Sequence, residues 1–99
     1  MALIRVKNLL LRTFIGFNPE EIDNKQDVVI NIEIEADIPE EVLLADESDG
    51  IYNYKTITKQ IIELVQDNRF KLLEVLTKNI LDLIMADERV VRARVEVDK

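Results

Sequence analysis

The chain of 99 residues contains no cysteine, no histidine and no tryptophan. Without cysteine it can form no disulfide, no thiolate metal site and no cysteine nucleophile. Without histidine it can form neither a histidine-based catalytic triad nor a histidine zinc site. Only two glycines are present, so a glycine-rich phosphate-binding loop is excluded as well. Any acid–base chemistry must therefore use Asp, Glu, Lys or Tyr.

The composition is that of a globular domain. Apolar residues make up 47% and charged residues 33% of the chain, which is neither a disordered nor a membrane-like composition. The length predicts a single domain over residues 1–99. A net charge of −7 disfavours nucleic acid and anionic membranes as partners. Arg5, Lys7 and Arg12 interrupt the apolar N-terminal run, so we expect neither a signal peptide nor a membrane span and predict a cytoplasmic protein.

Two strands are predicted in the first third of the chain. Residues 3–17 are rich in strand formers, but their alternation changes phase, which predicts a bulge near Asn8. Gly16 and the pair Asn18-Pro19 mark a turn. Residues 28–36 then alternate strictly, with one apolar face and one mostly polar face. The two strands are expected to form an antiparallel hairpin.

Residues 37–49 carry six acids and no base, and we interpret them as a solvated loop or a short irregular helix. The spacing of Asp46, Asp49 and Gly50 does not match a metal-binding loop, so no metal site is predicted.

Two helices and a third strand are predicted in the rest of the chain. Asn53 is a good N-cap for a helix whose apolar residues recur at helical spacing until Asp67-Asn68. A second helix has the apolar stripe Leu72, Leu73, Leu76, Ile80, Leu83 and Ile84, and it ends at Asp87-Glu88. Residues 90–98 alternate again, with Val91, Ala93, Val95 and Val97 on one face. The order strand-strand-helix-helix-strand predicts an α+β domain with both helices on one face of an antiparallel sheet.

This predicted core is thin for its length, and the last strand runs to the final residue. We therefore expect the chain to be cut inside a structural unit.

Four ionisable residues are candidates for chemistry. Counting by twos places Lys99 on the apolar face of the last strand, where loss of solvent would make it a base, although a frayed terminal lysine in solvent is the more ordinary finding. Glu74 lies in an apolar run and could hold a polar ligand or form a surface pair with Lys78. Tyr54 could donate a proton to a carbanion or simply pack over the start of a helix. Glu21 lies in a polar turn, where a solvated acid is the ordinary finding. These patterns alone do not name a reaction.

Five segments together resemble the dihydroneopterin aldolase family. They span nearly the whole chain in the family's order. These segments are Arg12-Thr13-Phe14-Ile15-Gly16, residues 24–31 (NKQDVVIN), residues 53–59 (NYKTITK), residues 68–74 (NRFKLLE) and Val95-Glu96-Val97-Asp98-Lys99. The resemblance implies the tunnelling fold, with the family's last strand missing from this chain.

The resemblance also assigns roles to the four candidates. It implies that Lys99, Tyr54 and Glu21 are catalytic, and that Glu74 anchors the pterin ring in the family's Leu-Leu-Glu run, beside Leu73. The resemblance also implies that Asn53 is a substrate-binding position. Many aldolases of the family carry histidine at this position, whereas the epimerase-like members resemble this chain at the same position.

We therefore expect an epimerase that inverts the 2′-carbon of 7,8-dihydroneopterin triphosphate by retro-aldol and aldol steps, without a cofactor. The alternatives are a dihydroneopterin aldolase, a pterin-binding assembly subunit without turnover, and a small α+β domain with an unrelated partner. The family further implies a homo-oligomer of tetrameric rings, paired into an octamer, with sites between subunits. Family members continue past the lysine with a Pro-led loop and a fourth strand, so the activity of a shortened chain is an open question.

Overall fold

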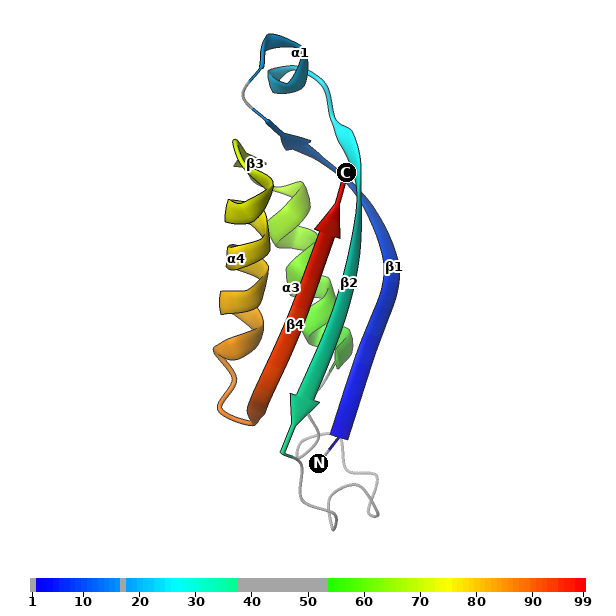
Figure 1. Ribbon diagram of the computed structural model, residues 1–99, viewed down its shortest axis with the longest axis vertical. Coiled ribbons are helices and arrows are strands. Elements are labelled where there is room, and N and C mark those ends of the chain that lie inside the picture. Colours follow the sequence, from blue (N-terminus) through cyan, green and yellow to red (C-terminus); the bar gives the residue numbers. More distant parts are fainter. Residues whose placement is uncertain (1, 17, 38–53) are drawn as a thin grey trace.

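The computed structural model describes residues 2–16, 18–37 and 54–99. The elements follow the predicted order, with two short additions, α1 and β3 (Figure 1). In chain order they are β1 (Ala2–Ile15), α1 (Pro19–Ile22), β2 (Gln26–Ala36), α3 (Tyr54–Gln66), β3 (Arg69–Phe70), α4 (Leu73–Met85) and β4 (Val90–Asp98). None of the helices in the described residues is long and apolar enough to cross a membrane. The predicted N-cap Asn53 and nearly all of the acidic segment 37–49 lie outside the described residues.

The sheet has the strand order β3-β1-β2-β4. The predicted α+β architecture is confirmed: β1 pairs antiparallel with β2, and β2 pairs antiparallel with β4. The prediction of a purely antiparallel sheet is wrong, because β3 runs parallel to the end of β1. Phe70 of β3 is buried and belongs to the hydrophobic core, so β3 contributes an apolar side chain in addition to its pairing with β1. Two residues are too few for a strand pattern to be visible in the sequence.

The predicted bulge in β1 is confirmed. The pairing of β1 with β2 shifts register between Val6 and Leu9. Asn8 has φ 55°, and its N–H donates to Oδ1 of Asn31 at 2.9 Å. The extra residue turns Leu9 and Leu11 to the same face as Ile4 and Val6, so that all four contribute to one core.

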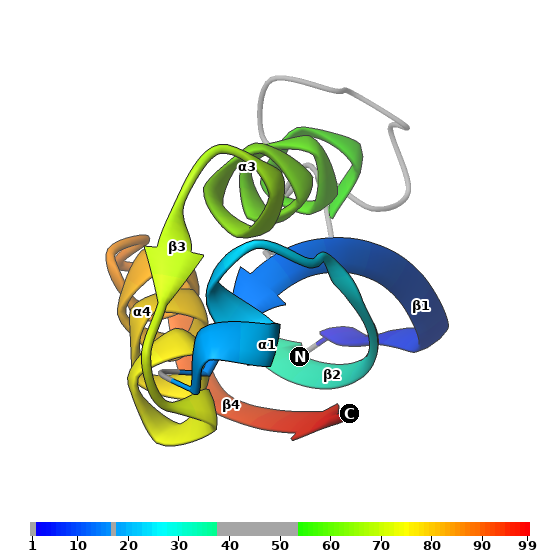
Figure 2. The ribbon, with the colours of Figure 1, turned by 90° about the horizontal axis from the view of Figure 1, so that it is seen from above.

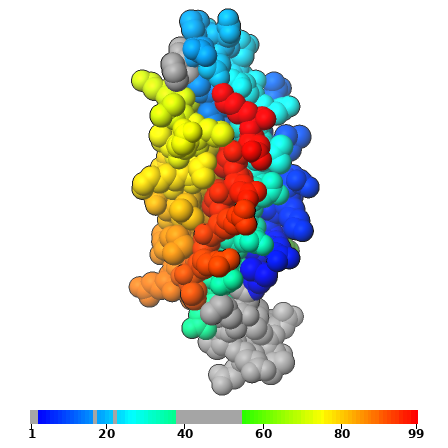
Figure 3. Space-filling model, viewed as in Figure 1, coloured from blue at the N-terminus to red at the C-terminus, as the bar shows by residue number. Residues whose placement is uncertain are grey.

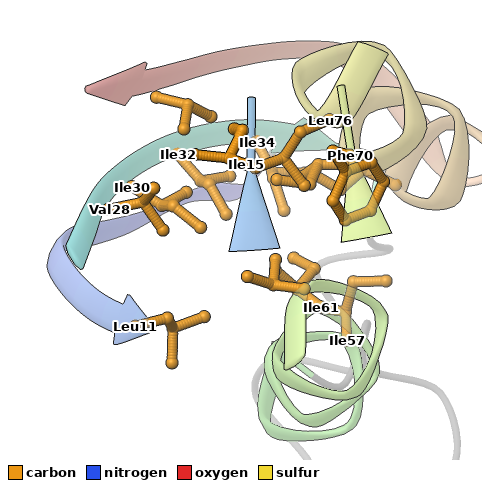
Figure 4. Close-up of a cluster of buried hydrophobic side chains, with 14 of the residues drawn as sticks. Leu11, Ile15, Val28, Ile30, Ile32, Ile34, Ile57, Ile61, Phe70 and Leu76 are labelled. Carbon is orange, nitrogen blue, oxygen red and sulfur yellow. The ribbon is translucent and has the colours of Figure 1, made fainter. Parts of the chain in front are cut away.

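The core lies between one face of the sheet and the two long helices (Figure 4). α3 packs against β1 and α4 packs against β4 (Figure 2). The predicted inner face of β2 is confirmed, since all five of its apolar residues are buried: Val28, Ile30, Ile32, Ile34 and Ala36. At about 1.5–3 kcal/mol for each large aliphatic side chain, this burial is the main stabilising contribution.

Two predicted core positions are wrong. Leu72 is the N-cap residue of α4 and is 47% exposed, because the chain is still extended there and has not yet turned its side chain toward the sheet. Val91 is 52% exposed. The β2–β4 pairing shifts register between Glu35 and Ala36, so that Val90 instead of Val91 faces the core.

The two ends of the molecule differ in what they carry. At one end lie α1, β3, the beginning of α4 and the C-terminus of the chain (Figure 1). The beginning of α3 lies at the opposite end, near the start of β1 and the end of β2.

Candidate active site

The carboxylate of Glu21 is the centre of a polar cluster at the first of these ends. Its Oε2 accepts a hydrogen bond from Lys99 Nζ at 2.7 Å and another from Gln26 Nε2 at 3.2 Å. Its Oε1 accepts from the backbone N–H of Asn18 at 3.4 Å. Gln26 Nε2 also donates to the carbonyl of Ile15 at 3.0 Å, which ties the cluster to the end of β1.

Local sequence explains why Glu21 lies there. Asn18 is the N-cap residue of α1 and Pro19 follows at the first helical position, where its fixed φ suits a helix start. Glu21 is the third helical residue, the position from which a glutamate reaches back to the N-cap backbone. The predicted turn is thus a short helix, and the sequence signal for it was an N-cap residue followed by Pro-Glu-Glu.

The surroundings of Glu21 favour its charged form. The hydrogen bond from Lys99 is the largest cause that holds its pKa below the ordinary value of 4.5, and the Gln26 amide adds to it. The side chain of Glu21 is 19% exposed and that of Lys99 is 41% exposed. The alternative of a solvated loop acid without partners is therefore excluded for Glu21.

Lys99 follows the last residue of β4, as predicted, but the prediction that it lies on the apolar face is wrong. Its side chain is exposed and ends on Glu21 instead of in the core. Val97 is the last buried residue of β4, and Asp98 and Lys99 beyond it are exposed. On the surface, the C-terminal residues lie just below the α1 segment (Figure 3).

Glu74 lies in the first turn of α4, at the same end of the molecule (Figure 1). It is exposed and lines a shallow depression together with Leu73, Thr77, Lys78 and Leu81. The sequence suggested Lys78 as a possible surface partner of Glu74. In the structure Lys78 Nζ instead donates to Asp82, one helical turn after Lys78, at 2.9 Å. Leu73 is half-buried and forms the apolar side of this depression.

Tyr54 is the first residue of α3, at the opposite end from Glu21, Glu74 and Lys99 (Figure 1). The 13 residues of α3 separate the two ends of that helix by about 18 Å along its axis. One chain therefore brings Glu21 and Lys99 together, holds Glu74 at the same end, and keeps Tyr54 far from all three.

Two cations lie against the aromatic ring of Phe14, near the end of β1. The guanidinium of Arg69 is 3.9 Å from the centre of the Phe14 ring, and Lys25 Nζ is 5.7 Å from it. The N–H of Gly16 donates to the carbonyl of Phe70 at 2.8 Å, so β3 is joined to the turn that precedes Glu21. Positive charge is thus held on the Phe14 ring, near the end of β1.

The sequence alone predicts no role in the site for Gly16 or Gln26. Gly16 was a turn marker, and its φ of 114° is the backbone reason for that signal. Gln26 precedes the alternating part of β2, and nothing in the pattern separates its amide from any other polar loop residue. Within the described residues no three carboxylates gather into a group that could hold a metal ion.

Comparison with known sequences identifies relatives over nearly the whole chain. The family model FolB, described as dihydroneopterin aldolase, matches residues 4–99. The dihydroneopterin triphosphate 2′-epimerase of Escherichia coli strain K12 is 49% identical over 98 residues, which cover 99% of this chain and 81% of that protein. The protein of the same name from Pseudomonas aeruginosa is 54% identical over 99 residues, covering 100% of this chain and 80% of the relative.

Solved structures share the fold. A putative dihydroneopterin aldolase from Vibrio cholerae has a TM-score of 0.88 at 24% identity, covering 98% of this chain and 81% of the other. The dihydroneopterin aldolase of E. coli, solved in complex with neopterin, has a TM-score of 0.88 at 23% identity, covering 98% and 84%. The tunnelling fold predicted from the resemblance is thereby confirmed.

Proposed function

The chain belongs to the dihydroneopterin aldolase family, and we propose that it is an epimerase that inverts the 2′-carbon of 7,8-dihydroneopterin triphosphate. The choice of substrate is supported by sequence identities of 49% and 54% to two dihydroneopterin triphosphate 2′-epimerases over almost the entire chain. The observation that supports the chemistry is the contact between Lys99 Nζ and the Glu21 carboxylate.

The pterin ring is proposed to bind at the beginning of α4. A pterin presents neighbouring N–H groups on one edge, and a carboxylate can accept two of them in parallel. Glu74 is exposed and has Leu73 beside it, so it combines such an acceptor with an apolar wall for the flat ring. Asn53 stays a predicted substrate contact.

The reaction begins with removal of the proton from the 2′-hydroxyl group. The electrons of that O–H bond form the aldehyde carbonyl, the bond between the first and second side-chain carbons breaks, and its electron pair moves into the ring imine. The dihydropterin ring is thus the electron sink. Lys99 is proposed as the base, acting through water. Since Lys99 Nζ donates to Glu21 in the resting pair, Lys99 must first lose one ammonium proton to solvent before it can act as the base, while the Glu21 carboxylate stays charged.

Epimerisation and aldol cleavage share this intermediate. In an epimerase the aldehyde fragment turns and adds again to the enamine carbon through its other face. In an aldolase the enamine carbon is protonated and the aldehyde leaves. Tyr54 is proposed as the donor of that proton, because a phenol is acidic enough to protonate a carbanion-like carbon. The second candidate, a dihydroneopterin aldolase, is favoured by the family match itself.

A complete site is proposed to need two subunits. Tyr54 begins α3 at the end of the molecule opposite to Glu21, Glu74 and Lys99, about 18 Å of helix away. A neighbouring subunit that brings its own Tyr54 to this end would complete the set. We propose a ring assembly, expected to be tetramers paired into an octamer, with each site between neighbours.

The triphosphate is proposed to lie toward Arg69 and Lys25. Both cations are held against the Phe14 ring, on the strand that leads directly into Gly16 and the Glu21 cluster. A chain of net charge −7 needs such local positive charge to accept a polyanion.

The test is incubation of the chain with dihydroneopterin triphosphate and, separately, with dihydroneopterin, followed by chromatography of the products. The proposal expects the 2′-epimer of the triphosphate as the main product. Accumulation of 6-hydroxymethyl-dihydropterin instead would assign the aldolase, and pterin binding without any product would assign a binding subunit without turnover. Absence of both binding and turnover would contradict the proposal.

A further inference from the structure

Gly16 lies directly against the Glu21 carboxylate. A Cβ atom built on Gly16 would lie closer than 3.0 Å to the carboxyl carbon and to both carboxyl oxygens of Glu21, a separation that real Cβ atoms do not take up. The contact is therefore with the acidic group itself and not with the stem of the side chain.

The backbone of Gly16 is held in place from both sides. Its N–H donates to the carbonyl of Phe70 in β3 at 2.8 Å. The preceding carbonyl, that of Ile15, accepts from Gln26 Nε2, and the same nitrogen donates to Glu21. With φ at 114°, Gly16 also has a conformation that L side chains rarely adopt. Since this backbone is fixed, an added methyl group would displace the carboxylate, which is the free end of a flexible side chain.

We propose that Gly16 is a positioning residue of the reaction. Because Gly16 has no side chain, the Glu21 carboxylate can occupy the space beside its Cα and accept the hydrogen bond from the Lys99 ammonium. The expected effect of Gly16 on turnover rests on the proposed function. The contact geometry behind it comes from Gly16, Glu21, Gln26 and Lys99 alone. In this arrangement Gly16 and Gln26 set where the carboxylate lies, and the carboxylate sets where Lys99 Nζ lies.

The first experiment is a double-mutant cycle between Gly16 and Glu21. Gly16→Ala should lower kcat by about tenfold or more, while KM for the pterin substrate stays within about threefold because Glu74 lies on another element. In a Glu21→Ala background no carboxylate is left to displace, so adding Gly16→Ala should lower the residual kcat by less than about twofold. An equal loss in both backgrounds would mean that Gly16 acts only through backbone strain, and would overturn the proposal.

The second experiment needs no turnover. Among the described residues the Glu21 carboxylate accepts hydrogen bonds from one cation, Lys99, and from the neutral groups of Gln26 and Asn18. The carboxyl carbon of Glu21, followed by NMR, should titrate below pH 4.5 in the native chain and move back toward 4.5 in Gly16→Ala. A Gly16→Ala chain that keeps the native midpoint would contradict the proposal, whatever the activity.

The matched control is Asn24→Ala, in the same loop. It removes the exposed hydrogen bond from Asn24 Nδ2 to the carbonyl of Glu20, 2.8 Å long, without adding an atom near the carboxylate. Its kcat and its Glu21 midpoint should both stay near native. If the native chain turns over no pterin while the NMR titration behaves as expected, the proposed function fails and the positioning of Glu21 by Gly16 stands.

Discussion

At the scale of single residues, Glu21 is held by contacts from four separate places in the chain. Lys99, Gln26 and Asn18 each donate to it, and Gly16 leaves room for it. Only the short separation between Asn18 and Glu21 is visible in a sequence window. Three predictions concern single residues of this end of the molecule.

The pKa of Glu21 makes its contribution to stability depend on pH. Because the folded-state pKa lies below the ordinary value of 4.5, the contribution is fully present above about pH 4.5 and is lost as pH falls through the folded-state value. Urea unfolding of native and Glu21→Gln chains should differ by a constant amount from about pH 5 to 7. The difference should shrink below about pH 4.5, and a difference that grows on acidification would contradict the hydrogen bond from Lys99 as its cause.

Lys99 can be tested as the base by two substitutions. Lys99→Ala should lower turnover on the order of a hundredfold or more, the scale for loss of a general base, while pterin binding persists. Lys99→Arg should restore little, since a guanidinium does not lose its proton near neutral pH. Near-native turnover of Lys99→Arg would reduce Lys99 to an electrostatic contact and move the base role to Glu21 or to solvent.

Glu74 can be tested as the pterin anchor. Glu74→Gln keeps the shape but exchanges one acceptor for a donor, so pterin binding should weaken by about 2–4 kcal/mol, as for breaking a charge-assisted pair. Folding should change little because the side chain is exposed. Asp82→Asn, which breaks the Lys78 pair two turns along the same helix, is the control and should leave affinity unchanged. Affinity within about threefold in Glu74→Gln would contradict the anchor role.

At the scale of elements, the end of β1 is joined to the end of α3 by one buried side chain. Thr13 is 0% exposed, and its Oγ1 donates to the carbonyl of Val65 at 2.5 Å. The last carbonyls of a helix lack partners within the helix, so this hydroxyl satisfies one of them where water cannot reach. The contact fixes the segment that continues into Phe14 and Gly16.

Removing this hydroxyl should therefore cost stability. Thr13→Val keeps the shape but leaves the Val65 carbonyl without its buried donor, which should lower the free energy of unfolding by about 1–3 kcal/mol. Thr77→Val is the matched control. The Thr77 hydroxyl donates to the Leu73 carbonyl of its own helix, so the loss should be under about 0.5 kcal/mol. Equal losses in urea unfolding of the two variants would contradict the stabilising role of the Thr13 hydroxyl.

At the scale of the whole molecule, the proposed catalytic set is divided between the two ends. Because Tyr54 begins α3 far from Glu21 and Lys99, hybrid assemblies should recover activity that single variants lack. Tyr54→Phe and Lys99→Ala chains, each impaired alone in aldol cleavage, should regain part of the cleavage turnover when mixed. Mass spectrometry of the assembly checks that the chains have exchanged, and exchange without any recovery would contradict shared sites.

The sequence by itself determined the parts of this protein that depend on near neighbours in the chain. The alternation in residues 28–36 predicted which face of β2 is buried, and the phase change near Asn8 predicted the bulge, because both follow from the two-residue period of a strand. The helical spacing of Leu76, Ile80 and Ile84 likewise predicted the buried stripe of α4. The assignment of roles to Glu21, Tyr54, Glu74 and Lys99 came from the family resemblance, and it stays a prediction.

Only the tertiary structure decided which groups from distant parts of the chain meet. Glu21 and Lys99 are 78 residues apart, and their contact depends on β4 pairing with β2 and on α1 folding back over the end of the sheet. The period of β4 predicted Lys99 on the apolar face, but that rule predicts burial only where other elements cover the strand, and the residues beyond Val97 are exposed. The sequence likewise does not show that the Glu21 carboxylate occupies the space beside Gly16. That contact follows only from the three-dimensional arrangement of the two residues.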